Sequence, residues 1–393
     1  MRILHTSDWH LGRSFGPVPL HDDQATFCDF LVDLVTRREL DLVVIAGDIY
    51  DRAVAPTESI ELFRRTLRRL RDAGAVVAVI SGNHDGADRL SPYDDLLDGS
   101  GIYVRGGYEG IGRVIPLEFH DGPLDLVLLP FLDPMAAPDD DARPVGEKLH
   151  RRNRKTHHEV LAEAIDRVHS ELQAPRSLAV AHAFVTGGVR PGDGPQESDS
   201  ERVLEIGGQG AVDATLFDDF SYTALGHLHR PQNVGRATIR YCGTPLPYSF
   251  SEDHPKSVTI VDMDPDGACV IEVVDVEVGR KVQSLTGTMA ELLDPDLHTE
   301  AEDRFVRATI TDPGVVLDAK ARLETRFPWT IEVRLHPRGS APSSPLDQPL
   351  APDHIDPLET VVTFWTERQE RPPNDLEHTL LRDAVSAATR GTS

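Results

Sequence analysis

Gly82-Asn83-His84-Asp85 follows, after Ser81, the wholly apolar run Ala-Val-Val-Ala-Val-Ile at residues 75–80. The run is rich in β-branched residues and is ended by a turn-forming glycine, so it predicts a buried strand. Side chains that can bind a metal or move a proton therefore lie where this strand ends, and open α/β sheets bind ligands at that edge. Taken alone, the motif is more typical of a surface loop. The motif becomes stronger evidence for a ligand site if other predicted strands end in similar residues.

The same pattern, a buried strand followed by ligand-type residues, recurs in four more segments. Strands are expected over residues 1–7, 42–46, 177–181 and 220–225. The residues that follow them are, in order, Asp8 and His10, then Asp48, then His182, then His227 and His229. Because residues i and i+2 of an extended chain point to the same side, we expect Asp8 and His10 to be able to bind one cation, and His227 and His229 to share a face of the chain. The alternatives are a turn acid with an incidental histidine for the first pair, and core or tautomer-fixing roles for the second.

Helices are expected between these strands. Residues 21–39, and a second segment that begins at Thr57, carry apolar residues at helical spacing. The residues of the second helix expected to face inward are Ile60, Phe63, Leu67 and Leu70. We interpret its arginines as a solvated face rather than a stripe for the DNA backbone. The alternation of strand and helix is typical of a layered α/β domain.

Composition divides the chain into four expected parts. The first, residues 1–280, ends in two strands joined by the turn Asp264-Pro265-Asp266-Gly267. A smaller strand–helix–strand unit occupies residues 281–337, with its helix expected over residues 316–326. A Pro- and Ser-rich linker occupies residues 338–357. The tail, residues 358–393, carries apolar stripes at helical spacing with no visible core of its own. Such stripes favour docking on a partner.

The bulk composition excludes several classes of protein. Of the 393 residues, 39% are hydrophobic and 27% are charged, and no apolar run approaches the length of a membrane span. The N-terminus has no signal-peptide core, and the three scattered cysteines fit a reducing cytoplasm. The net charge of −25 argues against wrapping nucleic acid by bulk electrostatics. It leaves room for a local basic groove, a metal-centred phosphate site, or DNA binding supplied by a partner.

The candidate ligands are carboxylates, an amide and imidazoles, with no thiolate. This set suits a pair of divalent ions such as Mn²⁺, Fe²⁺ or Zn²⁺. Asp48 is placed to bridge two cations, which lie about 3.5–4 Å apart in such sites. Two cations would keep a net positive charge beside Asp8 and Asp48, attract a phosphate and activate a water molecule. We expect His84 to remain free of metal for proton transfer, with Asp85 orienting its ring.

These motifs, in this order and spacing, resemble the calcineurin-like metallophosphoesterase family. They are Asp8-x-His10, Gly47-Asp48, Gly82-Asn83-His84, His182 and Gly226-His227-x-His229. The similarity covers about residues 1–230. Three longer stretches, residues 3–12, 226–232 and 241–252, resemble more specifically the nuclease subunits of bacterial DNA-processing complexes. Together with the tail, this resemblance covers nearly the whole chain.

The resemblance implies a fold and a site. The fold would be a four-layer α/β arrangement, a two-sheet β-sandwich flanked by helices, with a small DNA-capping domain at residues 281–337. One metal would be bound by Asp8, His10, Asp48 and His229. The other would be bound by Asp48, Asn83, His182 and His227, with His84 as the catalytic histidine. The metals would be two divalent ions, with Mn²⁺ the best candidate.

The resemblance also implies partners. The chain would be a DNA exonuclease and endonuclease acting on DNA ends and hairpins, with no membrane partner. It would form a homodimer within a heterotetramer, and its tail would bind the coiled coil of an ATPase. Asp51 stands where archaeal and eukaryotic relatives have a second histidine, so a DNA-positioning role for Asp51 is not implied. Competing functions are a phosphodiesterase or phosphatase for small molecules, and an inactive scaffold for the ATPase.

Overall fold

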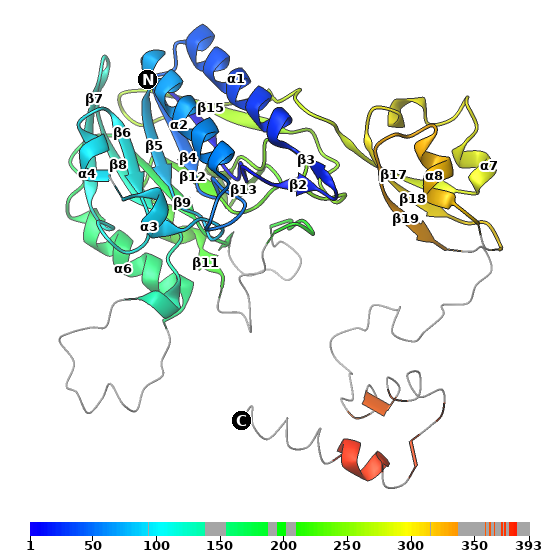
Figure 1. The fold of residues 1–393 in the computed structure, drawn as a ribbon. Helices are drawn as coiled ribbons and strands as arrows, with labels where there is room; N and C mark the ends of the chain where they lie inside the picture. The colour runs from blue at the N-terminus through cyan, green and yellow to red at the C-terminus, as the bar shows by residue number, and fades with distance from the viewer. Residues whose placement is uncertain are drawn as a thin grey trace. The chain divides into compact units, whose positions relative to one another are not determined.

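The structure, a computed structural model, describes most of the chain. The described residues are 1–92, 94–137, 155–187, 195–201, 210–314 and 316–336, and, beyond these, residues 358, 361–362, 365, 371, 373–374 and 377–382. The chain divides into two units, one formed by Met1–Ile310 and Val316–Leu335 and the other by Thr311–Val315 and His336–Ser393 (Figure 1). The predicted linker, residues 338–357, lies outside the described residues. So does Phe364 of the tail.

The first large sheet contains the N-terminal strand. Its strands are β1 (Arg2–Thr6), β4 (Leu42–Ala46), β5 (Val76–Ile80), β6 (Ile102–Arg105), β15 (Ser257–Met263) and β16 (Cys269–Asp275). They lie in the order β16-β15-β1-β4-β5-β6. Strands β1, β4, β5 and β6 are parallel to one another, and β15 pairs antiparallel with both β1 and β16. Helices α1 (His21–Arg38) and α2 (Thr57–Asp72) pack against one face of this sheet (Figure 1). The hairpin expected around residues 264–267 is confirmed as the pair β15 and β16.

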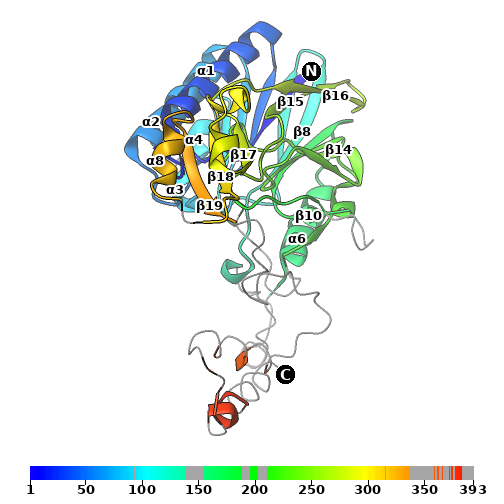
Figure 2. The ribbon, with the colours of Figure 1, turned by 90° about the vertical axis from the view of Figure 1, so that its right-hand side faces the viewer.

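The second large sheet packs face to face against the first. Its strands are β7 (Val114–Phe119), β8 (Gly122–Leu129), β9 (Ser177–His182), β12 (Tyr222–Gly226), β13 (Gln232–Val234) and β14 (Arg236–Tyr241). They lie in the order β13-β14-β12-β9-β8-β7. Helix α6 (His157–His169) begins at a capping box formed by Thr156 and Glu159. It packs against the outer face of this sheet (Figure 2).

The core between the two sheets explains the near-continuous apolar runs of the sequence. Alternate residues of β4 point in opposite directions, so Val43 packs under the helices while Leu42 and Val44 pack against the second sheet. Strands buried on both faces read as unbroken apolar runs. The layers are therefore helices, sheet, sheet and helix, which confirms the four-layer sandwich.

Short elements complete the first part of the chain. They are β2 (Ser14–Phe15), β3 (Val18–Pro19), α3 (Ala87–Leu90), α4 (Asp94–Asp98), β10 (Val185–Thr186), β11 (Val212–Asp213) and the 3₁₀ turns Pro134–Ala136 and Ala214–Phe217. Within the described residues, no helix combines the length and apolar character that crossing a membrane requires.

A third, smaller sheet follows residue 280. It consists of the parallel strands β17 (Val282–Gly287), β18 (Phe305–Ile310) and β19 (Thr330–Leu335), with helices α7 (Met289–Leu292) and α8 (Ala319–Glu324) and a 3₁₀ turn at Thr299–Ala301. It has its own apolar core, which includes Leu292, Leu323 and Phe327. The Phe305 ring stacks on Phe15 of β2, with ring centroids 4.6 Å apart.

Several sequence predictions differ from the structure in detail. Ile60 is 46% exposed, because the buried stripe of α2 runs instead through Leu62, Phe63, Thr66 and Leu70. The helix expected at residues 316–326 is shorter, since its first turn is replaced by a left-handed residue at 318. Strands β7 and β17 were not predicted, because β7 contains a proline at residue 116 and β17 carries polar residues typical of a surface loop.

Candidate metal centre

The structure brings the predicted site residues together at one edge shared by both large sheets. They come from the loops after β1, β4 and β5, from the end of β9 and from the loop after β12. Ligand atoms lie within 4.8 Å of one another in three overlapping groups, which are Asp8, His10 and His229, then His10, Asp48 and His84, then Asp8, Asp48 and His182. Asn83 and His227 join through hydrogen-bond distances described below. The convergence of strand ends follows from the parallel arrangement of these strands.

The backbone at this edge is not extended. Asp8, His10, Asp48 and His227 have φ angles of 53°, 44°, 49° and 110°. The expectation that the paired ligands share a side as residues i and i+2 of a strand is therefore wrong, because β1 ends at Thr6 and β12 ends before His227. Left-handed non-glycine residues cost about 1–3 kcal/mol each and persist where the surroundings fix them.

Glycines allow the two sheets to meet closely at this edge. A Cβ atom on Gly226 of β12 would lie 1.7 Å from the carbonyl oxygen of Ala46 in β4. A Cβ on Gly47, in the loop after β4, would lie 2.2 Å from Nδ1 of His182 in β9. Both distances are far below van der Waals contact. The glycines next to the motif residues are thus required for the side chains of both sheets to reach one point.

The hydrogen bonds of His182 show that its Nε2 atom faces another acceptor. Nδ1 lies 2.8 Å from the carbonyl oxygen of Ala46, which can only accept, so Nδ1 carries the hydrogen. Burial lowers the pKa of His182, which favours the neutral ring with a lone pair on Nε2. That atom lies 3.0 Å from Oδ1 of Asn83 and 3.6 Å from Oδ2 of Asp48. Acceptors that face one another without a hydrogen between them fit a shared cation.

A second set of acceptors meets around His10. Its Nε2 atom lies 3.3 Å from Nε2 of His229 and 3.7 Å from Oδ2 of Asp48. Burial holds the pKa of His10 well below its usual value and also lowers that of His229. Nδ1 of His227 lies 3.2 Å from Oδ1 of Asn83, which gives the amide oxygen a second nitrogen neighbour. Neutral imidazoles are the form that binds metals.

The two acids of the site are fully or almost fully buried. Asp8 accepts hydrogen bonds from Oγ of Ser7 and from the backbone N–H of His227, at 3.1 Å for the latter. Burial, and then the charge of Asp48, raise the pKa of Asp8 well above its usual value. Carboxylate oxygens of Asp8 and Asp48 lie within 4.8 Å of each other. Two ionised carboxylates at that distance need a positive charge between them. The donor set and its charge therefore fit divalent cations.

His84 differs from the other histidines because it is only partly buried. Its backbone N–H donates to Oδ1 of Asp48 at 2.9 Å, and its ring Nδ1 lies 3.0 Å from the backbone carbonyl oxygen of Asp51. The expectation that Asp85 orients this ring is wrong. Asp85 instead accepts backbone N–H groups from Gly82, Ile49 and Tyr50. A carboxylate that holds the turn together in this way is not available to the imidazole.

Sequence reasoning assigned no role to the groups that surround His229. Oε1 of Glu252 lies 3.0 Å from its Nδ1, and Oγ of Ser200 lies 2.7 Å from the same atom. Glu201 accepts the backbone N–H of His229 at 2.6 Å. Burial alone would raise the pKa of Glu252, but the charges and hydrogen bonds of Lys256 and His229 together outweigh this effect and hold that pKa well below its usual value. Glu252 lies more than twenty residues from His229 in sequence, so no local spacing indicates the contact.

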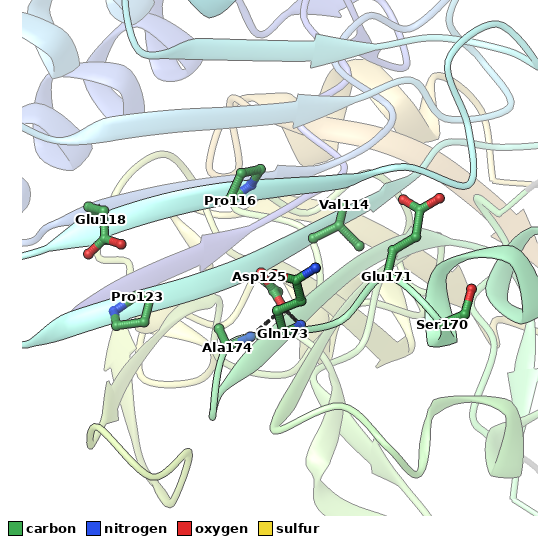
Figure 3. Close-up of a pocket in the computed structure, with 9 residues that line it drawn as sticks. All are labelled: Val114, Pro116, Glu118, Pro123, Asp125, Ser170, Glu171, Gln173 and Ala174. Atoms are coloured by element: carbon green, nitrogen blue, oxygen red, sulfur yellow. Dashed lines mark hydrogen bonds between the residues drawn. The ribbon is translucent and has the colours of Figure 1, made fainter.

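A separate cleft of about 620 Å³ lies between β7, β8 and the segment after α6 (Figure 3). Its lining includes the acids Glu118 and Glu171 and the apolar residues Val114, Pro116 and Pro123. Asp125 points toward the segment after α6 and accepts the backbone N–H groups of residues 173 and 174. None of the metal-centre residues lines this cleft, so its volume has no bearing on the chemistry of that site.

Comparisons with known proteins show what the chain is similar to. Residues 1–231 match the family described as calcineurin-like phosphoesterase. The SbcD protein of the nuclease SbcCD from Bacillus subtilis is 36% identical over 272 residues, which cover 67% of this chain and 67% of that protein. The protein of the same name from Staphylococcus saprophyticus is 28% identical over 336 residues, 84% of each chain. The crystal structure of TT1561 of Thermus thermophilus covers 70% of this chain and 99% of that one at 12% identity, and its TM-score of 0.37 is too low to bear on the fold.

Proposed function

Because the chain belongs to the calcineurin-like phosphoesterase family, we propose that it is the metal-dependent DNA nuclease subunit of an SbcCD-type complex. The observation that carries this proposal is the meeting of carboxylate, amide and imidazole acceptors at the shared edge of the two sheets. The similarity to the named nucleases extends beyond the phosphoesterase match, since it covers up to 84% of the chain. The reaction is hydrolysis of a phosphodiester bond.

Two cations would be held by these residues, with Asp48 common to both. One would be held by Asp8, His10, Asp48 and His229, and the other by Asp48, Asn83, His182 and His227. Mn²⁺ suits this mixture of oxygen and imidazole ligands. Bound cations supply a Lewis acid for the phosphate and lower the pKa of a bound water molecule. The chain's own contribution is to fix the ligand positions, with His182 held by a backbone carbonyl and His229 by a buried carboxylate.

His84 is the proton-transfer residue of this proposal. The carbonyl oxygen of Asp51 holds its Nδ1–H, which leaves Nε2 to carry the proton that the leaving oxygen needs. Its backbone N–H binds Asp48, so its position follows that of the bridging ligand. Asp51 acts here through its main chain. Its side chain pairs with Arg13 at 3.4 Å instead.

A direct test compares substrates. The purified chain is incubated with Mn²⁺ and either linear duplex DNA, a DNA hairpin or a chromogenic phosphodiester, with and without the ATPase subunit. We expect Mn²⁺-dependent cleavage of DNA ends and hairpins that the ATPase stimulates. Cleavage of the small diester alone, with DNA left intact under all conditions, would point to a small-molecule phosphodiesterase. No hydrolysis of any substrate, despite bound metal, would point to an inactive scaffold.

The remaining parts of the chain would serve DNA and the partner. Residues 281–337, with the β17–β19 sheet and its separate core, would form a DNA-capping domain. Residues 358–393 would bind the SbcC-type ATPase, and the complex would contain two copies of each subunit. The support for the tail is its sequence, in which apolar stripes that include Trp365 and Leu380 follow a Pro-rich segment. Short helices of this kind need a surface on which to bury their apolar stripe.

Truncation after Pro357 tests the proposal for the tail. We expect the shortened chain to bind Mn²⁺ and melt at the same temperature as the full chain, but not to co-purify with the ATPase. Co-purification of the shortened chain would refute docking through the tail. A large fall in melting temperature would show instead that the tail stabilises the nuclease part.

A further inference from the structure

Glu252 contacts His229 on the side of the ring that faces away from the candidate cations. Its Oε1 atom lies 3.0 Å from Nδ1 of His229, while Nε2 of the same ring lies 3.3 Å from Nε2 of His10. A carboxylate can only accept, and the Ser200 hydroxyl near the same Nδ1 donates its hydrogen to Oε1 of Glu252. Nδ1 of His229 therefore carries the hydrogen, and the lone pair of Nε2 points into the site. Glu252 therefore selects the tautomer that can bind metal.

The other oxygen of this carboxylate belongs to a closed ring of hydrogen bonds. Nζ of Lys256 lies 2.5 Å from Oε2 of Glu252 and 2.7 Å from Oγ1 of Thr244. The Thr244 hydroxyl in turn donates to the same Oε2 at 2.9 Å. The Glu252 side chain is 0% exposed and that of Lys256 is 7% exposed. A carboxylate buried this deeply persists as an anion only because the ammonium group is paired with it.

In the second cation site, the group that holds the outer ring nitrogen of a histidine carries no net charge. Nδ1 of His182 is held by the neutral backbone carbonyl of Ala46 rather than by an anion. An anionic acceptor makes the opposite ring nitrogen a more basic ligand, and outer partners of this kind typically contribute about 10–100-fold to metal affinity. The two cation sites are thus supported unequally.

From this asymmetry we propose that Glu252, paired with Lys256, is a positioning residue that makes the cation site containing His229 the tighter of the two. The inference rests on the proposed function, because it assumes that both sites bind divalent metal. Glu252 does not touch the substrate or the metals. It acts through the orientation and basicity of the His229 ring.

The test needs variants that leave the fold intact. Glu252→Gln alone would leave Lys256 buried without its counter-ion, which is strongly destabilising. The variant Glu252→Gln with Lys256→Met removes both charges at nearly constant shape. Glu252→Asp is the second variant, because it keeps an anion for Lys256 but withdraws it from His229. The matched control is Glu272→Gln with Arg38→Met, an ion pair between β16 and the end of α1.

Mn²⁺ is titrated into each full-length chain and free Mn²⁺ is followed by electron paramagnetic resonance. We expect two binding steps in the wild type and the control. In both Glu252 variants the tighter step weakens about 10–100-fold while the weaker step stays unchanged. The melting temperature of the metal-free variants should match that of the wild type.

Each outcome separates the claims. Two unchanged steps in both variants would overturn the role of Glu252 and leave the proposed function standing. Equal weakening of both steps, with a lower melting temperature, would make Glu252 a purely structural residue and would also overturn the inference. A wild-type chain that binds no Mn²⁺ would refute the proposed function itself, and the inference with it.

Discussion

The two large sheets supply different chemistry to the edge they share. The loops of the first sheet supply the acids Asp8 and Asp48, the amide of Asn83 and the histidines 10 and 84, whereas the second sheet supplies imidazoles alone. Three of the four ligands with positive φ belong to the first sheet. The bent backbone is shared by two acids, Asp8 and Asp48, and by two histidines, His10 and His227. His182 differs from them, because it reaches the site from within the regular strand β9.

Contacts across the edge make the two halves depend on each other. His182 from the second sheet is oriented by the carbonyl of Ala46 from the first, and the backbone N–H of His227 donates to Asp8. The first sheet thus provides negative charge and the second provides most of the neutral nitrogen ligands. Loss of a residue from the first sheet should disturb charge balance, while loss from the second should remove one ligand only.

Asp48→Ala should have the largest effect, because it removes the ligand that we propose both cations share and one of the two carboxylates, Asp8 and Asp48, of the proposed ligand set. We expect the variant to bind at most one metal weakly and to show no measurable nuclease activity. The matched substitution in the second sheet is His227→Ala, which should retain one metal. Metal content by elemental analysis after dialysis measures both. Two metals in Asp48→Ala together with none in His227→Ala would reverse the proposed division between the sheets.

His84→Ala should separate catalysis from metal binding. The side chain is partly exposed and its Nδ1 is held by a backbone carbonyl, so its loss removes a proton donor rather than an essential ligand. General acid–base catalysis contributes about 10²–10⁴-fold, and we expect a fall of that size in turnover with two metals retained. Wild-type turnover, or loss of both metals, would contradict the assignment. The second outcome would make His84 a ligand, consistent with its position beside His10 and Asp48.

Gly226→Ala should separate the sheets at the point where they meet. The new Cβ would lie 1.7 Å from the carbonyl oxygen of Ala46, and neither backbone can yield without moving its strand. We expect a loss of about 3 kcal/mol or more in the free energy of unfolding, measured by urea denaturation. The control is Gly99→Ala, where no atom lies within 4 Å of the new Cβ and φ is not positive. Equal stability of the two variants would contradict the close approach.

Asp51→Asn should have the smallest effect. The group that holds His84 is the main-chain carbonyl of residue 51, which the substitution leaves in place. The side chain of Asp51 pairs with Arg13 at 3.4 Å and with Arg52 at 3.6 Å, and partly exposed pairs of this kind contribute about 1 kcal/mol or less. It also lies 3.9 Å from Nδ1 of His10, which is too long for a hydrogen bond. Nuclease turnover should therefore fall by less than about tenfold. A loss as large as that of His84→Ala would show that the Asp51 side chain takes part in the reaction.

The sequence predicted the composition of the site better than its geometry. Buried strands that end in Asp48 or His182 are visible as apolar runs, because both faces of those strands are covered. The left-handed backbone at Asp8 and His10 was not predictable, since their tight turn depends on hydrogen bonds that they donate to the loop after β4, such as Asp8 N–H to Gly47 O at 3.0 Å. Glu252 was missed for a similar reason, because it meets His229 only after β14 has returned to the same edge.

Anomalous diffraction at the manganese edge, from crystals grown with Mn²⁺, tests the central claim most directly. The account predicts two peaks about 3.5–4 Å apart at the edge shared by the two sheets. One peak should lie among Asp8, His10, Asp48 and His229, and the other among Asp48, Asn83, His182 and His227. A single peak, or peaks that do not share Asp48, would contradict it.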